Sequence, residues 1–147
     1  MRRGDLLRAP PGISVADAAR RMARKNVGAV AVMERGHLVG IFTERDIVFR
    51  VVARGLALNT TCVADVMTRA VHTIDADAPF GSALLIMHDN RFRHLPVVDN
   101  GKLVGMVSGR LALDPDLEDF VFEARRREYW RGEQERHPSL SPSRKSR

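Results

Sequence analysis

The sequence contains an internal repeat, and this repeat limits the possible folds more than any other feature. The tripeptide Leu38-Val39-Gly40 returns 65 positions later as Leu103-Val104-Gly105. At the same offset, residues 14–45 align with residues 79–110 without a gap. A match in register over such a length indicates two copies of one supersecondary unit that pack on each other.

Both copies show the hydrophobic periods and turn signals of a short strand, a helix, a β-hairpin and a second helix. In repeat 1 (residues 1–58) we expect a strand at 6–8, a helix capped by Ser14, strands at 29–33 and 38–42, and a helix from Thr43. In repeat 2 (residues 59–115) we expect a strand at 71–74, a helix opened by Asp77 with Pro79 in its first turn, strands at 94–98 and 103–107, and a helix soon after Ser108. Residues 62–68 predict a short helical turn between the copies.

The predicted fold class is α/β (α+β), with two tandem repeats packed about a pseudo-twofold axis. One repeat alone would leave a sheet face bare, and the second copy covers it. We also predict a C-terminal helix at residues 116–137, docked through Phe120, because an isolated helix with so short an apolar stripe is marginal in water. Residues 138–147 are predicted to form a disordered basic tail.

Composition narrows the cellular setting. The chain has one cysteine, Cys62, so it forms no intramolecular disulfide, which fits a reducing compartment. The basic residues 1–5 precede no apolar run long enough for a signal peptide or a membrane span. We expect a cytoplasmic protein without a membrane partner. The net charge of +6 favours an anionic partner.

Three motifs lie at the ends of strands or between the copies. They read Gly40-Ile-Phe-Thr-Glu-Arg-Asp46, Arg93-His-Leu-Pro-Val-Val-Asp99 and Val66-Met-Thr68. From about residue 6 to residue 113, the sequence resembles a pair of CBS (cystathionine beta-synthase) domains, a Bateman module. The resemblance implies a regulatory module that binds AMP, ADP, ATP or a related adenosyl effector in a cleft between the copies. It implies no catalysis and no required cofactor.

The residue types of the first motif suit an adenine nucleotide. Thr43 stands at a strand-to-helix junction, where free N–H groups favour a phosphate, and Asp46 can accept hydrogen bonds from both ribose hydroxyls. Gly40 lets a flat ring approach the backbone, and Ile41 offers an apolar wall. A structural alternative is that Thr43 and Asp46 only cap the helix, since Ser/Thr-x-x-Asp is also a capping pattern.

By the same resemblance, residues of repeat 2 close the cleft that holds Asp46. The expected lining residues are Ala78, Ala83 and Leu103. Arg93 and His94 are expected to supply positive charge for ligand phosphates. The structural alternatives are core positions for the first three, a solvated arginine and a hydrogen-bonded histidine.

The second cleft departs from the motif, because Leu111 stands where an aspartate is expected. A leucine cannot hydrogen-bond a ribose diol, so this cleft should bind a nucleotide weakly or not at all. Its residues are Ile13, Ala18, Leu38, Met106 and Ser108. The sequence therefore predicts one competent site per chain.

Other functions have less support. A nucleic-acid-binding protein is the alternative, resting on Arg125-Arg-Arg127, Trp130 and the basic tail, although acidic residues are interspersed among them. No metal-ligand spacing and no catalytic constellation is present. We expect a homodimer through the second helices of both repeats, whose apolar residues are Ile47, Val48, Val51 and Val52 in repeat 1 and Leu111, Ala112 and Leu113 in repeat 2. We also expect an unknown regulated partner protein.

Overall fold

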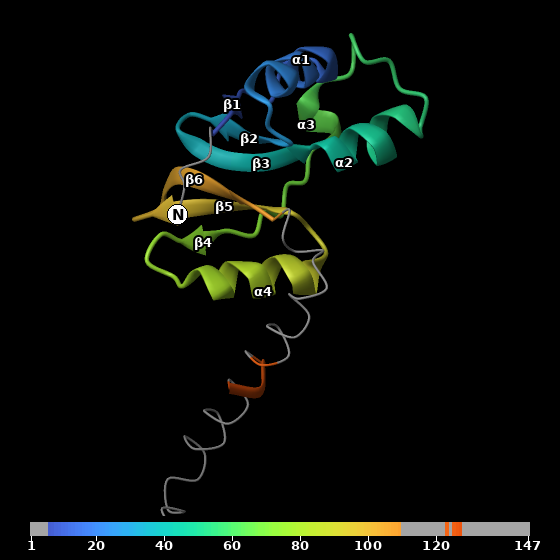
Figure 1. The fold of residues 1–147 in the computed structure, drawn as a ribbon. Helices are drawn as coiled ribbons and strands as arrows, with labels where there is room; N and C mark the ends of the chain where they lie inside the picture. The colour runs from blue at the N-terminus through green and yellow to red at the C-terminus, as the bar shows by residue number, and fades with distance from the viewer. Residues whose placement is uncertain (1–5, 110–122, 124, 128–147) are drawn as a thin grey trace, which may run out of the picture. The chain divides into compact units, whose positions relative to one another are not determined.

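Each repeat is built around a β-hairpin that is closed by a two-residue turn. The computed structural model describes residues 6–109, 123 and 125–127 of the chain. Both central residues of each turn have positive φ: 50° and 77° at Arg35 and Gly36, and 49° and 78° at Asn100 and Gly101. Such turns match the right-handed twist of the strands they join. They connect β2 (Ala29–Glu34) with β3 (His37–Thr43), and β5 (His94–Asp99) with β6 (Lys102–Ser108), as Figure 1 shows.

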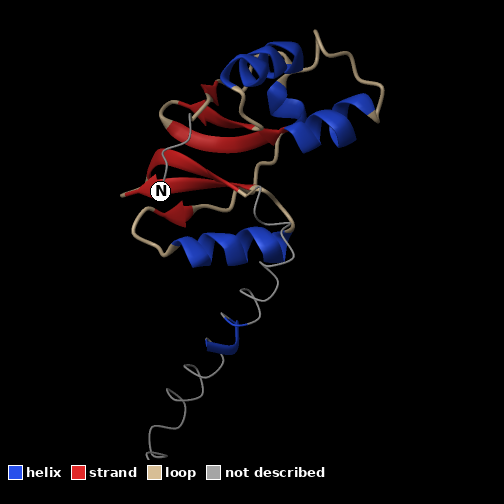
Figure 2. Ribbon diagram, in the orientation of Figure 1, coloured by secondary structure: helices blue, strands red, loops and turns tan. Residues whose placement is uncertain are grey.

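A short parallel strand extends each hairpin to three strands. β1 (Arg8–Ala9) pairs with β2 and β4 (Ile74–Asp75) pairs with β5, so the strand orders are β1-β2-β3 and β4-β5-β6 (Figure 2). These two strands are shorter than predicted and lie nearer the C-terminal ends of the expected segments. Only residues that face the neighbouring strand can join the ladder, and hydrophobic periodicity does not show where that pairing begins.

The two sheets share one pairing register. Ala29 pairs with Thr43 in repeat 1, and the corresponding His94 pairs with Ser108 in repeat 2. A shift of register follows Val32 in the first hairpin and Val97 in the second, again 65 positions apart. A β-bulge is specific to a place in a fold, so its recurrence shows that both repeats are the same backbone unit. The predicted α/β tandem repeat is confirmed.

The first helices of the two repeats begin differently. α1 (Val15–Lys25) starts as predicted, with the Ser14 hydroxyl accepting from the Asp17 N–H at 3.1 Å. α4 (Phe80–Asn90) starts later than predicted, with Pro79 as its N-cap. The Asp77 N–H donates instead to the Asp75 side chain at 3.0 Å, so Asp77 belongs to a turn that precedes the helix. The prediction that Asp77 opens this helix is therefore wrong.

The helix after β3 begins where the sequence predicts it. Thr43 is the N-cap of α2 (Glu44–Asp46), which continues as the π-helix η1 (Ile47–Val52). The wider π turn is marked by the Ala53 N–H, which donates to the Val48 carbonyl at 2.9 Å. Sequence periodicity does not distinguish a π-helix from an α-helix over so few residues.

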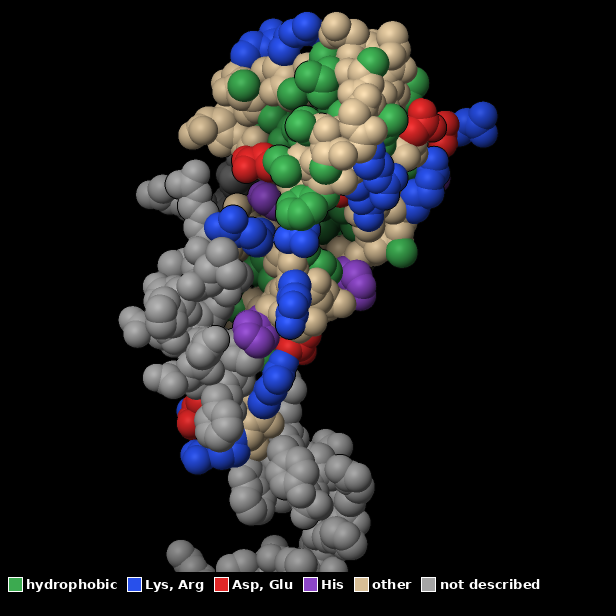
Figure 3. Space-filling model, turned by 90° about the vertical axis from the view of Figure 1, so that its right-hand side faces the viewer, with side chains coloured by type: hydrophobic (Ala, Val, Ile, Leu, Met, Phe, Trp, Pro, Cys, Tyr) green, Lys and Arg blue, Asp and Glu red, His purple; other side chains and the backbone are tan. Residues whose placement is uncertain are grey.

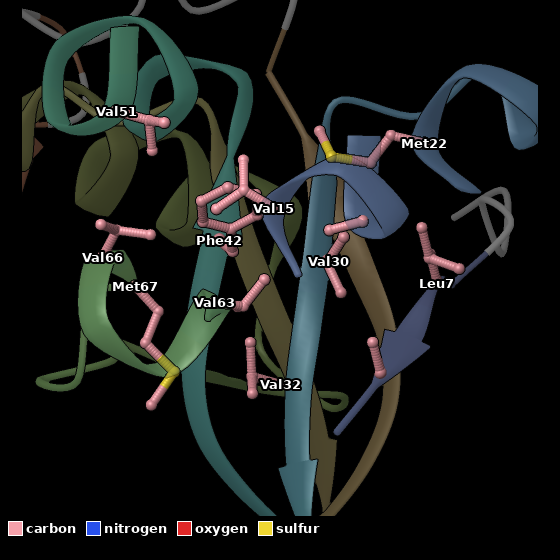
Figure 4. Close-up of a cluster of buried hydrophobic side chains, with 12 residues drawn as sticks. Leu7, Val15, Met22, Val30, Val32, Phe42, Val51, Val63, Val66 and Met67 are labelled. Atoms are coloured by element: carbon pink, nitrogen blue, oxygen red, sulfur yellow. The ribbon is translucent and has the colours of Figure 1, made fainter. Parts of the chain in front are cut away.

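The segment between the repeats contributes to the core of repeat 1. The predicted helical turn is α3 (Val63–Val66). Its residues Val63 and Val66, together with Met67, are buried against Val15 and Phe42, as Figure 4 shows. This segment therefore packs as part of the first core, whereas the sequence shows only that it lies between the two copies.

The two repeats contact each other through their hairpins. β3 and β6 lie in contact, and the Arg8 guanidinium donates to the Leu103 carbonyl at 2.9 Å. In the C-terminal segment, residues 123 and 125–127 are helical. The rest of the predicted helix at 116–137, its Phe120 anchor and the predicted tail at 138–147 lie outside the described residues. None of the helices in the described part of the chain combines the length and apolarity that a bilayer crossing requires.

Candidate functional site

Thr43 and Asp46 bind each other at the junction of β3 and α2. One Asp46 oxygen accepts from the Thr43 N–H at 2.9 Å and from the Thr43 hydroxyl at 3.2 Å. The Asp46 N–H donates in return to the Thr43 hydroxyl at 3.4 Å. This reciprocal pair is a capping box. Thr43 and Asp46 therefore do cap the helix, which is the structural alternative for their spacing.

Capping does not fully account for the environment of Asp46. Asp46 is only 7% exposed, and this burial raises the pKa of its carboxyl above the ordinary value. The Thr43 hydrogen bonds and the positive charges of Arg50 and Arg45 act in the opposite direction, but they do not cancel the effect of burial. A buried carboxylate whose charge is incompletely compensated can accept further hydrogen bonds, and such groups cluster at functional sites.

The two arginines nearest to Asp46 are largely engaged elsewhere. The Arg50 guanidinium donates to the Val66 and Met67 carbonyls at 3.2 and 3.1 Å, while its Nε lies 3.5 Å from Asp46. The Arg45 guanidinium lies 4.6 Å from the centre of the Phe49 ring. Arg50 thus ties η1 to the end of α3, and Arg45 covers the neighbouring aromatic ring.

The expectation of free N–H groups at the start of α2 is only partly met. The Thr43 N–H donates to Asp46, and the Glu44 N–H donates to the Gly28 carbonyl at 3.0 Å. Two donors that were expected to face a phosphate are therefore already bound within repeat 1. Capping interactions compete for the same groups that an anion would use.

Gly40 serves packing within repeat 1. A Cβ at Gly40 would meet the Met67 side chain, so in this structure Met67 packs directly over Gly40. The space that a ligand ring was expected to use is occupied here by Met67. Ile41 lies beside it, exchanges two backbone hydrogen bonds with Thr68, and is almost fully buried. At the matching Gly105, the nearest described atom to such a Cβ is the Val97 Cβ at 3.9 Å.

Repeat 2 brings His94 to the start of α2. The His94 Nε2 and the Glu44 Oε1 lie 3.0 and 2.7 Å from the point that a Gly28 Cβ would occupy. Burial lowers the pKa of His94, Glu44 opposes this effect, and the neighbouring charge of Arg93 adds to it. Arg93 itself is exposed, and its guanidinium forms no hydrogen bond or ion pair with the described residues.

Glu44 and Gly28 were not predicted as site residues. The sequence signal was present, because Gly28 is the repeat-1 counterpart of Arg93, and a small residue at that place leaves room for a side chain from the other repeat. The sequence alone could not show that the His94 and Glu44 side chains together fill the space above Gly28.

The remaining expected lining residues are mostly core positions. Ala83 is buried in α4, Leu103 is buried in β6, and Ala78 is half-buried just before α4. In the second predicted cleft, Ala18 belongs to the core of repeat 1 and Ile13 packs against it. Leu38 and Met106 are half-buried, and Ser108 is exposed. Leu111 lies outside the described residues.

Two alternative chemistries find little support. Within residues 6–109, 123 and 125–127, no three His, Cys, Asp or Glu side chains come together as metal ligands would. Arg126 and Arg127, part of the candidate nucleic-acid segment, form ion pairs with Glu123 at 3.6 and 3.5 Å. Their charge is therefore partly compensated within their own helix.

Comparison with known proteins identifies the family. A profile of the CBS domain matches residues 1–53 and 63–110, which is most of the chain. The chain therefore belongs to the CBS-domain family, with one match in each repeat. It is 39% identical over 108 residues to the CBS domain-containing protein CBSCBSPB3 of Arabidopsis thaliana, a match that covers 73% of this chain and 19% of the relative. The chain spans between about a fifth and about half of the length of curated relatives such as these.

Two similar solved structures contain adenine nucleotides. The CBS domain protein PAE2072 from Pyrobaculum aerophilum, complexed with AMP, is 26% identical, with a TM-score of 0.69 over 80% of this chain and 92% of that one. The cytosolic domain of the Mg²⁺ channel MgtE, in complex with ATP, is 26% identical, with a TM-score of 0.61 over 76% of this chain and 45% of that one. Both neighbours are thus CBS-fold proteins determined with an adenine nucleotide.

Proposed function

We propose that this chain is a regulatory module that binds one adenine nucleotide between its two repeats and catalyses no reaction. Asp46 carries the proposal. It is a buried carboxylate with a raised pKa at the start of α2, while Leu111 stands at the matching place in repeat 2. The AMP and ATP complexes of similar CBS proteins support the same class of ligand.

Asp46 would anchor the ribose. One of its oxygens is taken by Thr43, and the other lies near Arg50, so a ribose diol would add donors to a carboxylate that burial leaves incompletely compensated. Arg93 and His94 from repeat 2 would lie on the phosphate side. A ligand that contacts both repeats shifts their packing by its differential affinity for the two arrangements, and this shift would be the regulatory signal to a partner protein.

A thermal-shift titration of the wild type and of Asp46→Asn with AMP, ADP, ATP, NAD and S-adenosylmethionine tests this proposal. Asparagine keeps one oxygen for the Thr43 N–H but removes the charge, so the unliganded variant should be at least as stable as the wild type. The ligand-induced rise in Tm, which follows ln(1 + [L]/Kd), should be lost. If Asp46 is only a cap, the Asp46→Asn variant should keep any ligand response intact, and that result would remove Asp46 from the site.

We further propose that the module forms a homodimer through η1. Val48, Phe49 and Val52 are 54%, 57% and 61% exposed, and we call these three residues the η1 surface. On the face drawn in Figure 3, hydrophobic side chains gather over the part of the molecule formed by repeat 1. Exposed apolar side chains close together on one helix are typical of contacts with other chains. Of the predicted face, Val48 and Val52 are exposed, whereas Val51 is fully buried and Ile47 packs on the core of repeat 1, so these two are not available for such a contact.

A further inference from the structure

The acidic residue beside His94 bears on which adenine nucleotide the site can accept. Glu44 is the first residue of α2, next to Thr43 and two residues before Asp46. Its Oε1 and the His94 Nε2 approach the same point above Gly28, one from each repeat. The Glu44 carboxylate therefore lies where repeat 1 meets Arg93 and His94 of repeat 2 in the proposed site.

The charge of Glu44 is not neutralised by His94 at neutral pH. Burial holds the pKa of His94 below its ordinary value, so the imidazole is uncharged there. The structure shows no ion pair between these two described residues. His94 therefore offers the Glu44 side chain no positive charge at neutral pH.

The nearby arginines do not offset this charge either. Arg45 lies over the Phe49 ring, and Arg50 donates to two carbonyls at the end of α3. Arg93 is an exposed arginine beside His94 on the repeat-2 side. Two carboxylates, Glu44 and Asp46, therefore lie at the start of α2, and the two arginines that follow them in α2 and η1 are engaged elsewhere.

We propose that Glu44 is a specificity-determining residue that favours adenosyl ligands with one phosphate or none over di- and triphosphates. This inference rests on the proposed function, because it names the ligand class of the same site. Each further phosphate would add negative charge on the side of the site where Glu44 and His94 meet. Near a protein surface such repulsion changes binding severalfold, and it grows with each added charge.

Isothermal titration of adenosine, AMP, ADP and ATP in Mg²⁺-free buffer at pH 7.5 tests the proposal on three proteins: the wild type, Glu44→Gln and Glu34→Gln. Glu34 is the matched control, because it is an exposed glutamate paired with His37 at the opposite end of the same hairpin. We expect the wild type to bind AMP at least as tightly as ATP. Glu44→Gln should tighten ATP binding about threefold or more, tighten AMP binding less, and leave adenosine unchanged.

The control variant should behave as the wild type for all four ligands. If ATP binding is equally affected in Glu34→Gln, the effect is one of net charge and the proposal is wrong. If the wild type prefers ATP, or if the ratio of ATP to AMP affinity is the same in Glu44→Gln, Glu44 does not select the ligand, although the nucleotide site stands. If none of the four ligands binds to any protein, the proposed function fails and this inference fails with it. Glu44→Ala provides a second variant with the same expected order.

Discussion

The two repeats share a backbone but differ in the side chains at several places that bear on ligand binding. Strand pairing and the bulge recur at an offset of 65 residues. At that offset Gly28 and Ala29 correspond to Arg93 and His94, and Asp46 corresponds to Leu111. In the proposed site, repeat 1 would supply the ribose anchor and repeat 2 would supply Arg93 and His94. On this proposal, duplication gives both repeats the same backbone, and divergence of their side chains leaves one complete site instead of two.

The outer surfaces differ in the same way. Repeat 1 exposes the η1 surface together with Leu56 and Leu58, whereas the exposed large hydrophobic residues of repeat 2 among the described residues are Phe80 and Val104. These lie on different elements, α4 and β6. Among the described residues, the exposed large apolar side chains thus form a group on repeat 1 and stand singly on repeat 2, and residues 111–113 of repeat 2 lie outside the described residues. The group on repeat 1 is therefore the self-association surface that we propose.

The largest expected effect is therefore on assembly. Val52→Glu places a charge in the η1 surface and should convert a dimer into a monomer at tens of micromolar protein, because an unpaired charge in an apolar contact is costly. Val104→Glu is the matched control in repeat 2 and should leave the dimer intact. Light scattering after size-exclusion chromatography distinguishes the two. A wild type that is already monomeric, or a dimer that survives Val52→Glu, would contradict the assignment of this surface.

The glycines at corresponding places of β3 and β6 should respond differently to the same substitution. Gly40→Ala pushes a methyl group into Met67 and should lower the free energy of unfolding by about 1–3 kcal/mol, as expected for overpacking. Gly105→Ala meets only Val97 among the described residues and should change stability by about 0.5 kcal/mol or less. Urea unfolding measures both.

A second substitution sharpens this test. Met67→Ala removes the side chain that Gly40→Ala would strike, so in the double variant the two losses should not add. If Gly105→Ala lowers the free energy of unfolding as much as Gly40→Ala does, the two glycines are equally covered. The expected difference between the repeats would then be wrong.

The pH dependence of stability should originate in repeat 2. The pKa of His94 is lowered in the folded state, so the unfolded chain takes up its proton first as the pH falls. The contribution of neutral His94 is complete above the ordinary histidine pKa of about 6.5 and is lost progressively below it. Thermal melts between pH 7.5 and 5.5 should show Tm falling in the wild type and falling less in His94→Asn. An unchanged slope in the variant would assign the effect to other groups.

The smallest effect concerns the hairpin turns. Arg35 and Asn100 have the same left-handed conformation, which asparagine tolerates better than arginine. Arg35→Asn should therefore stabilise the protein by about 0.5–1 kcal/mol, and Asn100→Arg should destabilise it by a similar amount. Chemical denaturation measures the free energy of unfolding of both variants. If the two substitutions change it in the same direction, the two turns are not equivalent.

Repetition made most of the fold predictable. The offset, the Ser14 and Thr43 caps and the two hairpin turns all follow from local patterns, because each depends on residues close in sequence. The start of α4, the π-helix η1 and the position of Met67 over Gly40 do not, since they depend on hydrogen bonds and contacts made only in the folded chain. Thr43 and Asp46 could be named from the motif. Glu44 could not, because its role depends on His94, 50 positions away.

The central claim is that divergence has left one nucleotide site per chain, in the half that holds Asp46. Calorimetric titration with AMP tests it most directly when the corresponding hydroxyls are removed in turn, by Thr43→Ala and Ser108→Ala. We predict one AMP per chain in the wild type, binding weakened about tenfold or more in Thr43→Ala, and binding unchanged in Ser108→Ala. Two AMP molecules per chain, or a loss of binding in Ser108→Ala but not in Thr43→Ala, would contradict the account.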